Sequence, residues 1–364
     1  MVENMTKLSG FVGAAIVPHA PQMLSLPLSE DAEQVKRVRD VMMQIGTDLR
    51  AKNPDMVIVI GNDHGDDFIL RSIPAFIFHC GEVAEGRDGH HGKWAVNGAS
   101  GYSLLRAMQE EGFDPAFTLD APLGTYFTIP IEFMGWSRDT EVVPLFVNSY
   151  VPPQPSPERC MAFGQALSRA VQRLGKSAVL IASGGMSHYP GTSRYADPGP
   201  DDLADQKIFD NVSSGNLRSL LSLDENELDF TGNIELRSWL ILAGVVGQRR
   251  PQYASFEPNW HHNYGTFGWT DFSPSPLQKL WYTEHQTHRV ELARALHAIR
   301  TDEVAARSWL SDSHAYVASF NLTPDEANAL RAMDEVAMRD SLGIHALLTS
   351  GAIRHLAKIS KTIK

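Results

Sequence analysis

Residues 56–64 read Met-Val-Ile-Val-Ile-Gly-Asn-Asp-His, a continuous apolar run that stops at a polar turn and a histidine. Two further runs have the same form. Residues 11–17 are followed by a Pro-His pair ending at His19, and residues 178–182 by a Ser-Gly-Gly-Met-Ser-His turn ending at His188. Short continuous apolar runs are typical of strands that are covered on both faces of a sheet. The three histidines are therefore predicted to lie where three buried strands end.

The segments between these strands have helical patterns, for example at 32–51, 101–112 and 157–175. Alternating strands and helices predict an α/β fold with a mostly parallel or mixed sheet flanked by helices. In such sheets, ligands bind at the carboxyl ends of the strands. Residues 142–147 predict a further strand, and the proline within it indicates an edge strand or a bulge.

A Ser-Pro-Ser-Pro element within 271–278 is typical of a linker. Beyond it the chain is helical in pattern, and the stretch from Thr323 to Glu326 predicts a helix start with Thr as N-cap and Pro next. We therefore expect a large domain at 1–272 and a small all-α domain at 279–364.

Composition excludes several classes of protein. The formal net charge of −11 argues against nucleic acid or an anionic membrane as the main partner. With only Cys80 and Cys160, the chain cannot build a disulfide framework or a cysteine-based zinc cluster. The sequence shows neither a signal peptide nor an apolar run long enough for a membrane span. We expect a cytoplasmic protein.

His19, His64 and Glu235 form a candidate metal site. Glu235 belongs to a segment of helical character in which it shares one face with Trp239 and Leu242, and a carboxylate on an apolar stripe is costly unless it is paired or binds a metal. Two histidines and one carboxylate form the facial triad of non-haem Fe(II) oxygenases. The alternatives are histidines that merely anchor loops and a Glu235 that is exposed or paired with a basic residue such as Arg249.

His188 follows a turn of small residues that would let the backbone approach a ligand closely. Its imidazole could act as general base and acid towards a metal-bound phenol, or simply hydrogen-bond a neighbouring loop. For the pair His261-His262, a hydrogen-bonded loop pair is the favoured interpretation.

The segments Pro-His-Ala-Pro at 18–21, Asn-Asp-His at 62–64, Gly-Gly-Met-Ser-His at 184–188, and Glu235 with its following helix resemble the class III extradiol dioxygenases of the protocatechuate 4,5-dioxygenase family. The similarity to the catalytic subunit covers about residues 10–270. Residues 279–364 resemble the small helical subunit of the same family, fused here as in gallate dioxygenase-like members.

This resemblance implies that His19, His64 and Glu235 bind Fe(II) and that His188 is the catalytic acid/base. It also implies that the helical domain caps the site, that Asn263 contacts substrate, and that the protein is a homodimer. The partners expected are a small aromatic substrate and O₂. The implied function is extradiol cleavage of a catecholic or dihydroxy-heteroaromatic ring.

One departure concerns the substrate. Family members carry a second active-site histidine in a stretch that corresponds to residues 120–130, and this stretch contains no histidine here. Thr125 or Tyr126 could supply a hydrogen bond there, but neither replaces an imidazole as a base near neutral pH. We therefore expect an unusual ring, such as a hydroxypyridone or a substituted catechol.

Two alternatives stay open from the sequence. A metal-dependent hydrolase or lyase could use the same scaffold, because an open metal position also activates water. The second alternative is a binding protein that kept the pocket but has no catalytic activity.

Overall fold

The computed structural model describes residues 9–64, 67–68, 72–189, 192–194, 197, 199–272 and 287–362. The chain divides into two compact units, Met1–Pro274 and Ser275–Lys364. The linker expected at 271–278 lies, beyond Phe272, outside the described residues.

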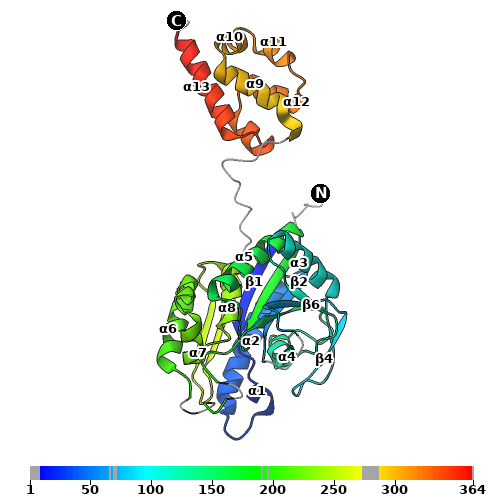
Figure 1. Ribbon diagram of the computed structural model, residues 1–364, viewed down its shortest axis with the longest axis vertical. Helices are drawn as coiled ribbons and strands as arrows, with labels where there is room; N and C mark the ends of the chain where they lie inside the picture. Colours follow the sequence, from blue (N-terminus) through cyan, green and yellow to red (C-terminus); the bar gives the residue numbers. More distant parts are fainter. Residues whose placement is uncertain are drawn as a thin grey trace. The chain divides into compact units, whose positions relative to one another are not determined.

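The first unit is built on a large sheet whose strands follow the order β6-β3-β7-β2-β8-β1-β10-β9, and a small sheet pairs β4 with β5 (Figure 1). The strands are β1 (Gly10–Val17), β2 (Met56–Asp63), β3 (Phe76–His79), β4 (Val83–Gly86), β5 (Gly92–Ala95), β6 (Ala116–Thr118), β7 (Val142–Asn148), β8 (Ser177–Ser183), β9 (Tyr253–Glu257) and β10 (Tyr264–Trp269).

The helices of this unit connect the strands. They are α1 (Gln22–Ser25), α2 (Ala32–Ala51), α3 (Gly98–Glu110), α4 (Thr125–Phe133), α5 (Pro157–Arg173), α6 (Asp202–Ser213), the 3₁₀ helix η1 (Leu217–Ser222), α7 (Glu225–Thr231) and α8 (Leu236–Val246). The predicted α/β class is confirmed.

The central strands β7, β2, β8 and β1 run parallel to their neighbours in this order. In contrast, β10 and β9 pair antiparallel at one side, and β3 pairs antiparallel with β7 at the other. The carboxyl ends of β1, β2 and β8 therefore lie at one edge of the sheet, as the sequence predicts for strands that end at histidines.

The strand at 142–147 is not an edge strand, and its register with β2 runs without a bulge, so the prediction of an edge strand or a bulge was wrong. β7 lies between β2 and β3 and pairs with both. Pro144 stands opposite Val59 of β2, whereas the pairing with the short β3 begins at Leu145. The proline is tolerated because β3 makes no ladder pair at its position.

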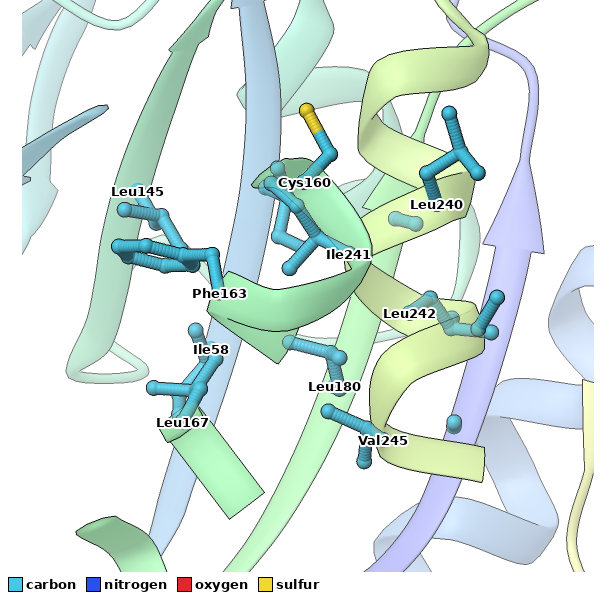
Figure 2. Packing of buried hydrophobic residues seen from close by; sticks show 14 of the residues in the cluster. Ile58, Leu145, Cys160, Phe163, Leu167, Leu180, Leu240, Ile241, Leu242 and Val245 are labelled. Carbon is cyan, nitrogen blue, oxygen red and sulfur yellow. The ribbon is translucent and has the colours of Figure 1, made fainter. Parts of the chain in front are cut away.

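Helices cover both faces of the sheet. One buried apolar cluster joins the sheet to α3, α5 and α8, and a second joins it to α2 and α4. Figure 2 shows the first cluster, with Phe163 of α5 and Ile241 of α8 packed above Leu180 of β8. Gly164 lies at the crossing of the two helices, where a Cβ atom would come within 1.8 Å of the Ile241 carbonyl oxygen. This close crossing fixes the position of α8.

The second unit is helical in its described part. Its elements are η2 (Thr287–Arg289), α9 (Val290–Thr301), α10 (Glu303–Ser311), α11 (Ser313–Ala318), α12 (Pro324–Ala332), the π-helix η3 (Ala337–Ser341) and α13 (Ala346–Thr362). The predicted helix start is confirmed, because the Thr323 hydroxyl accepts from the Glu326 amide while the Glu326 carboxylate accepts from the Thr323 amide. None of the helices in the described residues combines the length with the low polarity that crossing a lipid bilayer requires.

Candidate metal centre

The structure brings His19, His64 and Glu235 together. His19 lies two residues beyond β1, His64 directly follows β2, and Glu235 immediately precedes the first residue of α8. The Oε1 atom of Glu235 lies 3.4 Å from Nε2 of His19 and 3.1 Å from Nε2 of His64. The ligand atoms that the three residues offer all lie within 4.8 Å of one another.

These distances fit a shared metal ion. Ligand atoms at about 2.1 Å from an ion and at right angles to each other lie roughly 3 Å apart. Two imidazole nitrogens and one carboxylate oxygen are the donor set of the facial triad, which leaves coordination positions open for other molecules. The three side chains could therefore hold a transition metal.

Neighbouring groups orient two of these ligands. Nδ1 of His19 lies 2.9 Å from the Ser183 hydroxyl at the end of β8, which leaves Nε2 directed at Glu235. The Gly185 amide donates to Oε2 of Glu235 at 2.6 Å, so that Oε1 faces the histidines. Such outer contacts fix the ring orientation of metal ligands and the direction of ligating carboxylates.

Tyr150 holds the same carboxylate from another side. Its hydroxyl donates to Oε1 of Glu235 at 2.5 Å, and its ring stacks on His64 with centroids 4.8 Å apart. Burial, together with the charge of Glu235, raises the pKa of Tyr150 well above 10.0, so the hydroxyl stays protonated and remains a donor. Tyr150 was not predicted from the sequence, although it lies just beyond the carboxyl end of the parallel strand β7.

The environment of Glu235 rules out the two alternative interpretations. The residue is only 1% exposed, and Arg249 instead donates to the carbonyl oxygen of Val246. Burial alone would raise the pKa of Glu235, but the neighbouring imidazoles of His19 and His188 outweigh it and hold that pKa well below 4.5. Glu235 is therefore an ionised carboxylate among imidazoles.

His188 adjoins the candidate metal ligands. Its Nδ1 lies 2.6 Å from the Met186 carbonyl oxygen, and its Nε2 lies 3.7 Å from Oε1 of Glu235. A carbonyl oxygen only accepts, so Nδ1 carries the proton, and in the neutral ring Nε2 is a bare acceptor. Burial lowers the pKa of His188 below 6.5, which favours this neutral form. An imidazole in this form can take a proton from a hydroxyl beside the metal ligands.

Tyr126 and Thr125 lie on α4, and Tyr126 reaches the same region. The Tyr126 ring centroid is 5.3 Å from that of His64. Its hydroxyl donates to Oδ2 of Asp67 at 2.7 Å and accepts from Nη2 of Arg87 at 3.2 Å. Thr125 is the first residue of the helix and is buried. The substrate contacts expected of both residues stay predictions.

Asn263 is engaged in a polar network beneath the His188 turn. Its Nδ2 donates to Asp202 at 2.9 Å and to Asp205 at 3.0 Å, while its Oδ1 accepts from the Asn259 amide. Asp205 also accepts from the amide and hydroxyl of Ser187. Burial raises the pKa of Asp205 to about 6 against the effect of these donors. The side-chain amide of Asn263 is thus occupied by bonds within the protein. The substrate contact expected of this residue stays a prediction.

Comparison with known proteins gives one family. The catalytic LigB subunit of aromatic ring-opening dioxygenase matches residues 13–272. Among curated proteins, the 2,3-dihydroxyphenylpropionate/2,3-dihydroxicinnamic acid 1,2-dioxygenases of Escherichia coli strains K12 / DH10B and O157:H7 are 28% identical over 160 residues, which is 43% of this chain and 51% of theirs. The chain thus spans about half the length of these relatives.

Among solved structures, an uncharacterized protein from Escherichia coli K12 aligns over 71% of this chain and 99% of its own, with a TM-score of 0.48 and 17% identity. The family match covers well over half of the chain and includes all three candidate ligands and His188. The chain therefore belongs to the family of catalytic LigB subunits of aromatic ring-opening dioxygenases.

Proposed function

We propose that this protein is an Fe(II)-dependent extradiol dioxygenase that inserts O₂ into a catecholic or dihydroxy-heteroaromatic ring and opens it. The observation that carries the proposal is the convergence of His19, His64 and Glu235 beside His188. The family supports a ring-opening oxidoreductase, and the donor set favours iron because it matches the facial triad.

Different residues of the chain would have different roles in this reaction. His19, His64 and Glu235 would hold the ion on one side only, so that adjacent ring oxygens and O₂ can reach the other side. When bound, Fe(II) would supply Lewis acidity and redox chemistry. His188 would accept a hydroxyl proton of the substrate at Nε2 and return it to an oxygen during ring opening.

The curated relatives support a catechol-like substrate, since their names specify rings with two adjacent hydroxyl groups. The stretch from Asp120 to Pro130 contains no imidazole, so we expect a ring other than plain protocatechuate. The capping role of the helical unit and the homodimer stay predictions that follow from the resemblance.

Oxygen consumption tests the proposal. The full chain is reconstituted with Fe(II) without oxygen and then supplied with O₂ and a panel of catechols, gallates and hydroxypyridones. Uptake of one O₂ per ring consumed, with a new absorbing ring-opened product, would support the assignment. Failure of every ring with iron demonstrably bound would refute it, and hydrolysis supported by Zn(II) would favour a metal-dependent hydrolase instead.

Matched variants make the test specific to the site. His19→Ala should lose both the metal and the O₂ uptake, because it removes one of three ligands. His91→Ala should retain both, because that side chain is exposed and belongs to a different loop. Equal metal content in the two variants would contradict the proposed centre.

A further inference from the structure

His262 has a buried nitrogen without a partner. The residue is 5% exposed, and its Nε2 has no hydrogen-bond partner among the described residues. A buried polar atom without a hydrogen bond destabilises the folded protein, and such atoms in native structures call for an explanation. A ligand that bonds to Nε2 would provide one.

The ring of His262 lies at the candidate metal centre. Its centroid is 4.9 Å from that of His188. Both rings flank Gly185, because a Cβ atom there would lie 3.1 Å from Cδ2 of His262, 3.4 Å from its Nε2 and 3.3 Å from Cε1 of His188. The Gly185 amide is the group that holds Glu235. The unpaired nitrogen is thus next to the groups that would face a substrate.

A chain of hydrogen bonds fixes the tautomer of His262. Nδ1 of His262 lies 2.7 Å from Nδ1 of His261, and Nε2 of His261 lies 2.9 Å from Oε1 of Glu30. This carboxylate also accepts from Trp260 and Asn259. Because an ionised carboxylate only accepts, Nε2 of His261 carries the proton, and its Nδ1 is the acceptor.

The proton between the two rings therefore belongs to Nδ1 of His262. Burial lowers the pKa of His261 below 6.5, and burial, followed by the proximity of the His188 imidazole, holds the pKa of His262 well below 6.5. Both rings are neutral, so Nε2 of His262 has a free lone pair and no proton. It can accept a hydrogen bond but cannot donate one.

We propose that Nε2 of His262 accepts a hydrogen bond from a donor on the substrate ring, a hydroxyl or N–H group additional to the two metal-binding oxygens. This inference rests on the proposed function and narrows its substrate class. His262 would thereby supply the imidazole that the stretch from Asp120 to Pro130 lacks, from the other end of the catalytic unit. Glu30 and His261 act as positioning residues that keep Nε2 unprotonated.

Equilibrium binding without oxygen tests the donor. Catechol, 1,2,3-trihydroxybenzene and 1,2,4-trihydroxybenzene are titrated into the Fe(II)-loaded full chain. His262→Asn retains an N–H group near the Nδ1 position for His261 but removes the atom at Nε2. His262→Gln retains an acceptor near the Nε2 position. At least one of the two trihydroxybenzenes should bind the wild-type protein about 5- to 150-fold more tightly than catechol, because its third hydroxyl can donate to Nε2 of His262.

This preference should vanish in His262→Asn and be partly restored in His262→Gln. A purely structural role of His262 would weaken all three ligands equally, and that result would overturn the inference. This assay measures binding and not turnover, so it can detect the preference for a third hydroxyl even if the protein opens no ring. If the protein opens rings but shows no such preference, the inference about His262 is wrong and the proposed function still holds.

A second measurement needs no variant that might misfold. Nitrogen-15 spectra of the histidine rings are recorded on the wild-type full chain with Zn(II) in place of iron. We expect His262 to be protonated at Nδ1 and unprotonated at Nε2. A proton on Nε2 would overturn the inference, because the nitrogen would then be a donor.

Discussion

Replacing Tyr150 with Phe should weaken metal binding by about 10- to 100-fold. The hydroxyl donates to Oε1 of Glu235, the carboxylate oxygen that faces both candidate histidine ligands, at 2.5 Å in a half-buried position. A hydrogen bond to a charged group contributes about 1.5–3 kcal/mol, which corresponds to roughly 10- to 150-fold in an equilibrium constant. The Phe ring can keep the stack on His64, so the variant removes only the donor.

Tyr126→Phe is the matched control. Its ring also lies against His64, but its hydroxyl bonds to Asp67 and Arg87 rather than to Glu235. Competition with a chromophoric chelator, without oxygen, gives the dissociation constant of Fe(II) for wild type and both variants. Thermal unfolding of the metal-free proteins checks that they fold. Unchanged metal affinity in Tyr150→Phe, or an equal loss in Tyr126→Phe, would refute the positioning argument.

Three further outcomes follow from the structure. His188→Gln should keep the metal, measured by metal analysis, but reduce turnover in O₂-uptake assays by about 10²–10⁴-fold, as for loss of a general acid/base. Gly164→Ala should lower the free energy of unfolding in urea by about 1–3 kcal/mol because its methyl group overpacks the α5–α8 crossing, whereas the exposed Gln165→Ala should change it little. Arg37→Gln should be less stable than wild type at pH 7, because hydrogen bonding by Arg37 lowers the pKa of Glu257. A carboxyl group whose pKa is lower in the folded than in the unfolded protein stabilises the fold at pH values above its unfolded pKa. The difference in stability between wild type and Arg37→Gln should therefore disappear as the pH falls below 4.5, which urea titrations at several pH values would show.

The sequence predicts the centre of the sheet well. The apolar runs at 11–17, 56–60 and 178–182 became β1, β2 and β8, because a strand covered on both faces has no room for a polar residue. The helix predicted at 32–51 has the observed bounds of α2. Short strands such as β3 and β6 were not predicted, since three or four residues carry too little periodicity to identify a strand.

The site was predictable only in part. Histidines that follow buried strands can be read from the sequence, and the same rule applied to β7 would have indicated Tyr150. The role of His262 could not be read, because the carboxylate that fixes its tautomer through His261 is Glu30, 231 residues from His261 along the chain. No local sequence pattern distinguishes this chain of hydrogen bonds from the simple hydrogen-bonded loop pair that was predicted for His261 and His262.

The two imidazoles beside the candidate metal ligands, those of His188 and His262, limit what can bind there. His188 uses its Nδ1 proton on the Met186 carbonyl and His262 uses its own on His261, so each ring turns a bare lone pair to the site. Two acceptors cannot satisfy one another, and burial keeps both neutral. If the proposed function holds, a ligand beside these two rings would have to bring hydrogen-bond donors, as a polyhydroxylated ring does. A carboxylate at the same place would face two lone pairs, so an acidic substituent of the proposed substrate would have to point away from His262.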